Sequence, residues 1–239
     1  RQVLAELGVS RETLERLEIY ARLLAKWNKA VNLVGPDSLP DLWRRHVLDS
    51  AQLLPLLPPA TAGRTRRVAD LGSGAGFPGL VLAILGAGEI HLVESDGRKA
   101  QFLREVSRET AAGAQVHQAR IEDLSPLCAD CVTARALAPL DRLLDYAARH
   151  LARDGVALFL KGRGAAEELT QAAARWSMAV TRHPSRSDPG GTILALDSAR
   201  FSSDVLDVRQ ALTITVVPGE RAELSALAEP SQAAEPDAP

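Results

Sequence analysis

A glycine-rich turn constrains the fold of this chain more than any other feature. The segment 70–79 reads DLGSGAGFPG and lies between a short apolar run at 67–71 and an apolar stretch that begins at Leu80. Glycines allow the backbone to turn sharply and to approach a ligand closely, and Pro78 suits the first turn of a helix. A turn of this kind between a strand and a helix creates a ligand site at the carboxyl end of a parallel sheet.

From residue 66 onward, short apolar runs alternate with amphipathic stretches, which is typical of repeated strand–helix–strand units. The expected strands are 67–71, 90–94, 115–119, 130–134 and 156–160, and the expected helices are 78–86, 98–112, 139–152 and 165–176. Two further strands, 177–183 and 191–197, flank a turn rich in proline and glycine and are expected to form an antiparallel hairpin at the sheet edge. The sequence therefore predicts an α/β fold with a seven-stranded sheet.

Two helices are expected ahead of this core. The first spans 10–30, with Ser10 as its N-cap and apolar residues at steps of three and four. The second spans about 38–54 and is stopped by prolines. Together they form an N-terminal helical extension.

The chain is thus expected to consist of a helical cap over 1–60, a core over 61–201 and a C-terminal extension over 202–239. The extension is acidic and rich in alanine, glutamate, proline and serine, and we expect it to be largely disordered. Its run 212–217 is the one part able to form a strand. The remaining body is mildly basic, which permits a nucleic-acid partner without demanding one.

The two cysteines, Cys128 and Cys131, are too few for a disulfide scaffold or a four-ligand zinc site. We interpret both as structural residues and expect no metal. The chain shows no secretory leader, and no apolar run approaches the roughly 18–20 residues of a membrane-spanning helix. A cytoplasmic protein without a membrane partner is therefore expected.

Two cofactor classes compete for the glycine-rich turn. A dinucleotide fingerprint requires glycine at the sixth position of G-x-G-x-x-G, and Phe77 occupies this position. S-adenosylmethionine has no phosphate and needs room for a methionine and an adenosyl group instead. Glu94 follows at the end of the second expected strand, where an acidic side chain suits ribose hydroxyls in either case. The residues favour S-adenosylmethionine, and an NAD-dependent oxidoreductase stays the weaker alternative.

The turn with its Phe-Pro-Gly ending resembles motif I of the bacterial small-subunit ribosomal RNA guanine-N7 methyltransferases, the RsmG (GidB) family. Further matches follow in the family's order: WNxxxNLV at 27–34, HxxDS at 46–50, KxxFL at 99–103, RA at 135–136 and KG at 161–162. The resemblance implies a class I S-adenosylmethionine-dependent methyltransferase of Rossmann-like fold. It also implies methylation of N7 of the guanine at position 527, in the 530 loop of 16S rRNA.

The resemblance places the cofactor against motif I, the adenine beside Ile121 and Glu122, and Arg135 at the active-site edge. The expected cofactor-binding residues are Gly72, Gly74, Gly76, Phe77, Glu94, Ile121, Glu122 and Arg135. The expected partner is 16S rRNA or the small ribosomal subunit particle, and a monomer is expected.

Guanine N7 carries an unprotonated lone pair, so no base must remove a proton, and positioning is the main demand on the enzyme. Arg135 is the expected catalytic residue, which would orient the target base; a structural salt bridge is the alternative. Lys161 and Arg163 are expected to meet the RNA backbone, unless they lie on an ordinary solvated loop. His46 is a candidate for substrate binding, although an interface histidine with satisfied hydrogen bonds, which pins the cap to the core and lies within reach of Asp49, is the stronger interpretation.

Because a fold alone does not choose a substrate, two hypotheses stay open beside the rRNA methyltransferase. The first is a class I methyltransferase with another acceptor. The second is a non-catalytic RNA-interaction module that binds the cofactor without turnover.

Overall fold

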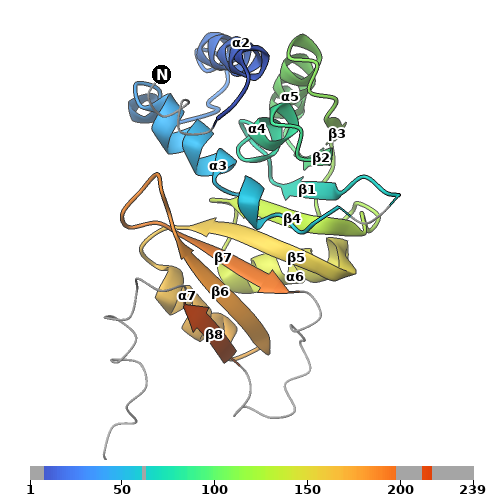
Figure 1. Ribbon diagram of the computed structural model, residues 1–239, viewed down its shortest axis with the longest axis vertical. Coiled ribbons are helices and arrows are strands. Elements are labelled where there is room, and N and C mark those ends of the chain that lie inside the picture. Colours follow the sequence, from blue (N-terminus) through green and yellow to red (C-terminus); the bar gives the residue numbers. More distant parts are fainter. Residues whose placement is uncertain (1–7, 61–62, 198–211, 217–239) are drawn as a thin grey trace, which may run out of the picture.

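The computed structural model describes residues 8–60, 63–197 and 212–216, and one sheet forms its centre (Figure 1). Its strands are β1 (Arg67–Leu71), β2 (Glu89–Val93), β3 (Gln115–His117), β4 (Ala129–Arg135), β5 (Leu151–Lys161), β6 (Met178–Pro184), β7 (Thr192–Asp197) and β8 (Leu212–Val216). The main helices are α2 (Arg11–Trp27), α4 (Gly79–Ile84), α5 (Gly97–Glu109), α6 (Leu140–His150) and α7 (Ala165–Ala172).

The strand order is β3-β2-β1-β4-β5-β7-β6-β8, and β1 to β5 run parallel. β7 runs antiparallel to both of its neighbours, β5 and β6. The seven predicted strands are therefore confirmed, and the run at 212–216 adds β8 beside β6. The order reverses between β1 and β4, and ligands of open α/β sheets bind at the carboxyl ends of the strands at such a switch point.

Helices cover both faces of the sheet because successive strand residues point to opposite sides. Val68 and Cys131 belong to a hydrophobic cluster with α2, α4 and α5, whereas Ala69 and Val132 belong to a cluster with α6 and α7. All four residues are fully buried. These are the layers of the α/β fold that the sequence predicts (Figure 1).

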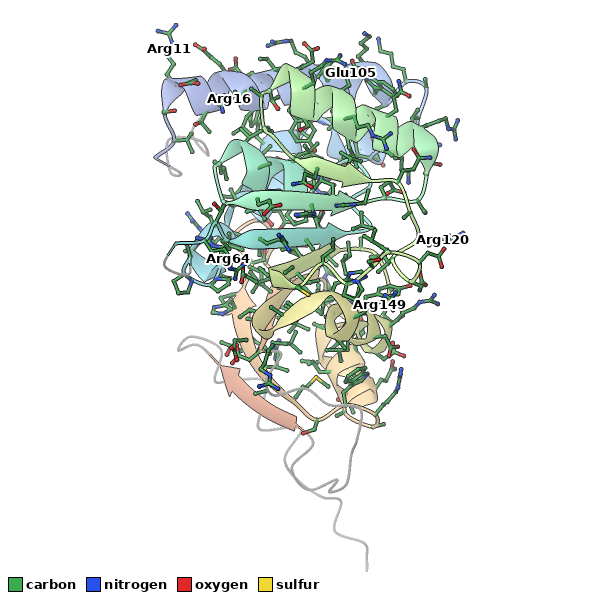
Figure 2. All side chains as sticks on the ribbon, turned by 90° about the vertical axis from the view of Figure 1, so that its right-hand side faces the viewer. Arg11, Arg16, Arg64, Glu105, Arg120 and Arg149 are labelled. Atoms are coloured by element: carbon green, nitrogen blue, oxygen red, sulfur yellow. The ribbon has the colours of Figure 1, made fainter. Side chains whose placement is uncertain are left out.

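α2 begins as expected, because the Ser10 side chain accepts a hydrogen bond from the Thr13 backbone N–H. Its inner face buries Leu17, Tyr20 and Leu24 in the same cluster as Phe102 of α5. The outer faces of α2 and α5 carry charged side chains, of which Arg11, Arg16 and Glu105 are labelled in Figure 2. The cap therefore shares a core with the rest of the molecule.

The second expected N-terminal helix, 38–54, is wrong as one continuous element. The chain instead forms the 3₁₀ turns η1 (Pro36–Ser38) and η3 (Leu54–Leu56), and a π-helical turn, η2 (Trp43–Leu48), leads into α3 (Asp49–Ala51). A hydrophobic period of three to four residues does not reveal a π turn, which inserts an extra residue and re-aims the side chains that follow.

The helix expected over 139–152 ends at His150, because Leu151 already pairs with Ala129 as the start of β5. The disorder expected for the C-terminal extension falls on 202–211 and 217–239, which lie outside the described residues.

Candidate active site

The glycine-rich turn curls at the carboxyl end of β1. Gly72, Gly74 and Gly76 all have positive φ angles, of 64°, 54° and 91°, a region that side chains rarely enter. The Ser73 N–H donates to the Val93 carbonyl of β2 at 3.0 Å, which fixes the turn against the neighbouring strand. Glycine therefore occupies these three positions because each requires a positive φ angle.

Asp70 supports the turn from beneath. Its carboxylate is buried and accepts hydrogen bonds from the Thr133 hydroxyl (2.8 Å) and from the Gly79 N–H (3.2 Å). Burial raises the pKa of Asp70 to about 6, against the lowering effect of these hydrogen bonds. A Cβ atom at Gly79 would lie 2.7 Å from Asp70 Oδ2. Asp70 therefore holds motif I in shape rather than facing a ligand.

One cavity of about 420 Å³ lies over this turn. Seven of the expected cofactor-binding residues line it: Gly72, Gly74, Phe77, Glu94, Ile121, Glu122 and Arg135. Gly76 is the exception, and the structure gives it another role. A Cβ atom at Gly76 would lie 2.4 Å from Leu80 Cδ1 and 2.9 Å from Tyr20 Oη, so this glycine faces the packed cap instead of the cavity.

Two carboxylates in this cavity are held in place. Glu94 accepts from the Gly74 N–H at 2.9 Å and from the Asp96 N–H at 2.8 Å, and it is buried. Glu122 is ionised, because a hydrogen bond from its own backbone and bonds from Tyr146 and Arg142 lower its pKa to about 2. The cavity thus presents fixed hydrogen-bond acceptors on one side and the apolar Ile121 beside them.

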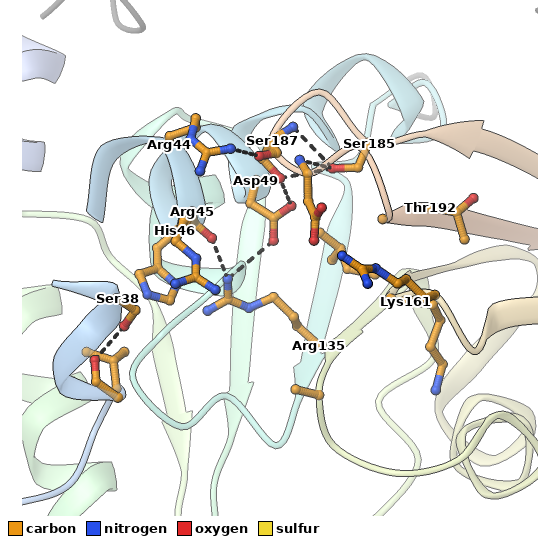
Figure 3. Close-up of a pocket in the computed structure, with 18 of the residues that line it drawn as sticks. Ser38, Arg44, Arg45, His46, Asp49, Arg135, Lys161, Ser185, Ser187 and Thr192 are labelled. Carbon is orange, nitrogen blue, oxygen red and sulfur yellow. Dashed lines mark hydrogen bonds and ion pairs between the residues drawn. The ribbon is translucent and has the colours of Figure 1, made fainter. Parts of the chain in front are cut away.

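A larger, open basin of about 1230 Å³ adjoins the first cavity (Figure 3). Both are lined by Leu33, Val34, Arg135, Ala136 and Leu137. The Asn28 side chain fixes the first two of these, because its carbonyl oxygen accepts from the N–H groups of Leu33 and Val34 at 2.9 Å. The smaller cavity and the basin therefore meet at a defined boundary.

Arg135 stands on this boundary, directly at the end of β4 as the sequence predicts. Its Nη1 donates to the Arg45 carbonyl at 3.1 Å and to Asp49 Oδ2 at 3.3 Å. Its guanidinium carbon lies 5.1 Å from the centre of the Phe77 ring. The salt bridge considered as an alternative role is thus present, and it coexists with a position that faces both cavities.

His46 packs against Phe77, the one aromatic residue of the glycine-rich turn. Its ring stacks on Phe77 with centroids 4.8 Å apart, and neither ring nitrogen has a hydrogen-bond partner among the described residues. Burial and then the charges of Arg135 and Arg45 lower its pKa to about 4, so the imidazole is neutral at physiological pH. The expectation of a histidine with satisfied hydrogen bonds is therefore wrong: His46 contacts the core by stacking on Phe77 and makes no hydrogen bond to Asp49.

The two basic residues expected to meet RNA differ from each other. Lys161 lines the basin, yet its ammonium donates to the Ala138 carbonyl (2.8 Å) and pairs with Glu168 at 2.6 Å. Arg163 is exposed at the basin rim, where its side chain lies against Gly190. Arg163 therefore offers its charge to solvent, whereas Lys161 ties the β4–α6 connection to α7.

Sequence reasoning missed one wall of the basin. The loop between β6 and β7 docks on the cap: Ser187 Oγ donates to Asp49 at 2.5 Å, and the Gln52 amide contacts Ser185 Oγ at 3.2 Å. Arg44 Nη1 donates to the Ser187 carbonyl. The HxxDS pattern marks Asp49, but no local signal pairs it with residues more than 130 positions away.

The cysteines and histidines form no metal site in the part of the chain that the structure describes, where no group of three suitable ligands occurs. Cys131 is buried in β4, Cys128 is exposed, and both are free thiols. The described helices also include none that is long and apolar enough to cross a bilayer.

Comparison with known proteins identifies close relatives. The family model described as rRNA small subunit methyltransferase G matches residues 13–188. The chain is 60% identical over 195 residues to ribosomal RNA small subunit methyltransferase G of Paramagnetospirillum magneticum, covering 82% of this chain and 93% of that protein. It is 59% identical over 192 residues to the protein of the same name from Rhodospirillum centenum, covering 80% and 87%. Among solved structures, the ribosomal protein L11 methylase of Lactobacillus delbrueckii subsp. bulgaricus matches with 21% identity and a TM-score of 0.49, over 62% of this chain and 77% of that one.

Proposed function

This chain belongs to the rRNA small subunit methyltransferase G family, and on that premise we propose that it transfers a methyl group from S-adenosylmethionine to N7 of the guanine at position 527 of 16S rRNA. The observation that carries the proposal is the meeting of a small cavity with a wider basin at Arg135. A methyltransferase needs this arrangement, because donor and acceptor must approach the same point from two sides.

The smaller cavity fits S-adenosylmethionine in size and in chemistry. Its volume of about 420 Å³ lies within the range of roughly 300–1,000 Å³ that small-molecule sites occupy. Glu94 would accept from the ribose hydroxyls, since each of its oxygens keeps a lone pair beyond its bond to a backbone N–H. Ile121 offers an apolar surface for the adenine. Gly74 leaves room along the turn, because a Cβ atom there would meet only the Gly72 carbonyl oxygen, at 3.8 Å, whereas the corresponding space at Gly72 is filled by Leu137.

When bound, S-adenosylmethionine supplies a methyl group on a positively charged sulfur; guanine N7 forms the new bond to carbon, and the electron pair of the broken C–S bond stays on sulfur. The chain itself needs no base for this step, because N7 carries no proton. Its contribution is to hold the two reactants in line, which is worth up to about 7–11 kcal/mol in favourable cases.

Arg135 is proposed to orient the guanine by donating to O6, the acceptor next to N7. His46 supports the same surface by stacking on Phe77, and its neutral imidazole adds no positive charge beside a base that becomes cationic. Arg163 is proposed to contact an RNA phosphate at the rim of the basin. Lys161 is proposed to support the wall of the basin, because its ammonium pairs with Glu168 and donates to the Ala138 carbonyl.

The proposal also covers the RNA partner, the oligomeric state, the location in the cell and the domain division. We infer that the acceptor is presented by 16S rRNA or by the small-subunit particle, that the enzyme works as a monomer, and that it acts in the cytoplasm where such particles are. We further propose a division into cap (1–60), core (61–201) and C-terminal extension (202–239), and the contribution of cap residues Leu33 and Val34 to both cavities supports the first boundary as functional.

The test is mass-spectrometric mapping of RNA methylated by the purified protein. Small-subunit particles lacking the modification, with labelled S-adenosylmethionine, should gain one methyl group on the guanine at position 527. Particles that carry 7-deazaguanine there should gain none, because that base has no N7 lone pair. A methyl group on a different nucleotide would assign another acceptor, and RNA binding without labelled product would make the protein a non-catalytic module.

A further inference from the structure

Asp49 lies at a junction of three parts of the molecule. Its Oδ2 accepts from Arg135 at the end of β4, and its Oδ1 accepts from Ser187 of the β6–β7 loop and from the Gln52 amide of the cap. The side chain is only 15% exposed. Figure 3 shows this carboxylate between Arg135 and Ser187, with dashed lines that mark its interactions with both.

The charge on Arg135 needs a counter-charge at this position. Its side chain is 19% exposed, and Asp49 is the one acidic side chain within salt-bridge distance of it in the described part of the chain. Asp70 is close enough for Arg135 to lower its pKa, but both Asp70 oxygens are engaged by Thr133 and Gly79. A partly buried charge that lacks a partner is costly.

The proposed reaction is sensitive to such a charge. The reactants carry one positive charge on the sulfonium, and the products carry it on the methylated guanine, so the reacting atoms are cationic throughout. An uncompensated guanidinium at the boundary of both cavities would repel this charge, although its N–H groups are well suited to hold guanine O6. The site therefore needs the hydrogen-bond donors of Arg135 while the positive charge of its guanidinium is neutralised.

We propose that Asp49 is a positioning residue that neutralises Arg135 and fixes its guanidinium, so that Arg135 donates hydrogen bonds at the reaction centre without adding net positive charge to it. The same carboxylate ties the β6–β7 wall of the basin to that guanidinium through Ser187. This inference rests on the proposed function, since it takes the smaller cavity as the sulfonium site.

A pair of ligands that differ in this one charge tests the idea by binding alone. S-adenosylmethionine carries the sulfonium charge, and S-adenosylhomocysteine has a neutral sulfur and is otherwise the same except for the methyl group. In Asp49→Asn, the ratio of the Kd for S-adenosylmethionine to the Kd for S-adenosylhomocysteine should rise about tenfold, because the unpaired Arg135 repels only the cationic ligand. Calorimetric titration measures both constants.

Companion variants separate electrostatics from scaffolding. Arg135→Gln leaves Asp49 unpaired and should shift the same ratio in the opposite direction, and the double variant Asp49→Asn/Arg135→Gln should return it to within about twofold of the wild-type ratio. Asp41→Asn is the matched control, because Asp41 lines the same basin but pairs with Arg44; its ratio should not change. If Asp49→Asn does not fold, the ratio of the two Kd values in Arg135→Gln still tests the inference.

Equal weakening of both ligands in Asp49→Asn, with an unchanged ratio, would overturn the inference and leave Asp49 as a scaffold residue. An unshifted ratio in Arg135→Gln would do the same. These outcomes differ from failure of the proposed function, which is measured separately by mapping the methylated nucleotide. Wild-type protein that binds neither ligand would instead remove the sulfonium site on which this inference rests.

Discussion

Replacing Gly74 by alanine tests where the cofactor lies, because it separates backbone strain from loss of ligand space. Gly74 has a φ of 54°, and a Cβ atom built there meets nothing closer than the Gly72 carbonyl oxygen at 3.8 Å. The new methyl group would therefore enter the smaller cavity without touching a protein side chain. Its effect on the protein is strain alone, and its effect on a ligand is direct obstruction.

Both effects have expected sizes. A non-glycine residue in the left-handed region costs about 1–2 kcal/mol, which lowers Tm by roughly 2–8 °C in a chain of this size. An extra methyl group in a close-packed contact costs about 1–3 kcal/mol, and this corresponds to a rise of about 5- to 150-fold in the Kd for S-adenosylmethionine. Gly74→Val, with a larger side chain, should raise this Kd by about 150-fold or more.

Gly86→Ala provides the matched control. Gly86 also has a positive φ, of 72°, and open space around its Cβ position, but it is exposed after α4 and lines neither cavity. Thermal unfolding should therefore show a similar loss of Tm in both variants, while calorimetry shows weakened binding only in Gly74→Ala. Wild-type affinity in a folded Gly74→Ala variant would refute the placement of the cofactor over the turn.

Three other outcomes are expected. Glu94→Gln should raise the Kd for S-adenosylmethionine by about tenfold, through one lost charge-assisted hydrogen bond, and equilibrium dialysis that finds no change would remove Glu94 from the ribose site. Arg163→Ala should reduce the slope of log K against log salt for RNA binding by about 0.7–0.9, whereas Arg11→Ala, on the outer face of α2, should leave that slope unchanged; equal slopes in all three proteins would argue against a phosphate contact. For Asp70, the folded pKa of about 6 exceeds the unfolded value near 3.9, so the folded chain keeps a proton that the unfolded chain has released and stability falls as pH rises from about 4 to 6. Asp70→Asn should flatten this part of the curve of unfolding free energy against pH, and an unaltered curve in chemical denaturation would show that Asp70 does not cause it.

The local parts of the molecule could be predicted from the sequence. β1 was expected at 67–71 and is found there, because its apolar run is bounded by charged residues and by the turn. Ser10 was expected to cap α2 and does so. The positions of Glu94 and Arg135 followed from strand ends, since parallel strands bring their carboxyl ends to one edge of a sheet.

The pairings between distant segments could not be predicted in this way. Asp49 was expected near His46, three residues away, yet its partners are Arg135 and Ser187. Lys161 carries no sequence sign that Glu168 will neutralise it. The contacts of Asp49 depend on how the cap and the β6–β7 loop dock, and the pair of Lys161 with Glu168 depends on how α7 packs beside the end of β5. Hydrophobic period and turn chemistry contain no information about either.

The contact between α2 and the glycine-rich turn limits how far the N-terminus of this enzyme can be truncated. Tyr20 lies in the N-terminal helix, but its hydroxyl donates to the Ala75 carbonyl and its ring stacks on Phe77. Excising the N-terminal helices to obtain a minimal fragment would remove the contacts of Tyr20 with the glycine-rich turn and leave the Ala75 carbonyl and one face of Phe77 open to water. The cap is accordingly not a detachable module, and any truncated version will need a substitute for Tyr20 to support this turn.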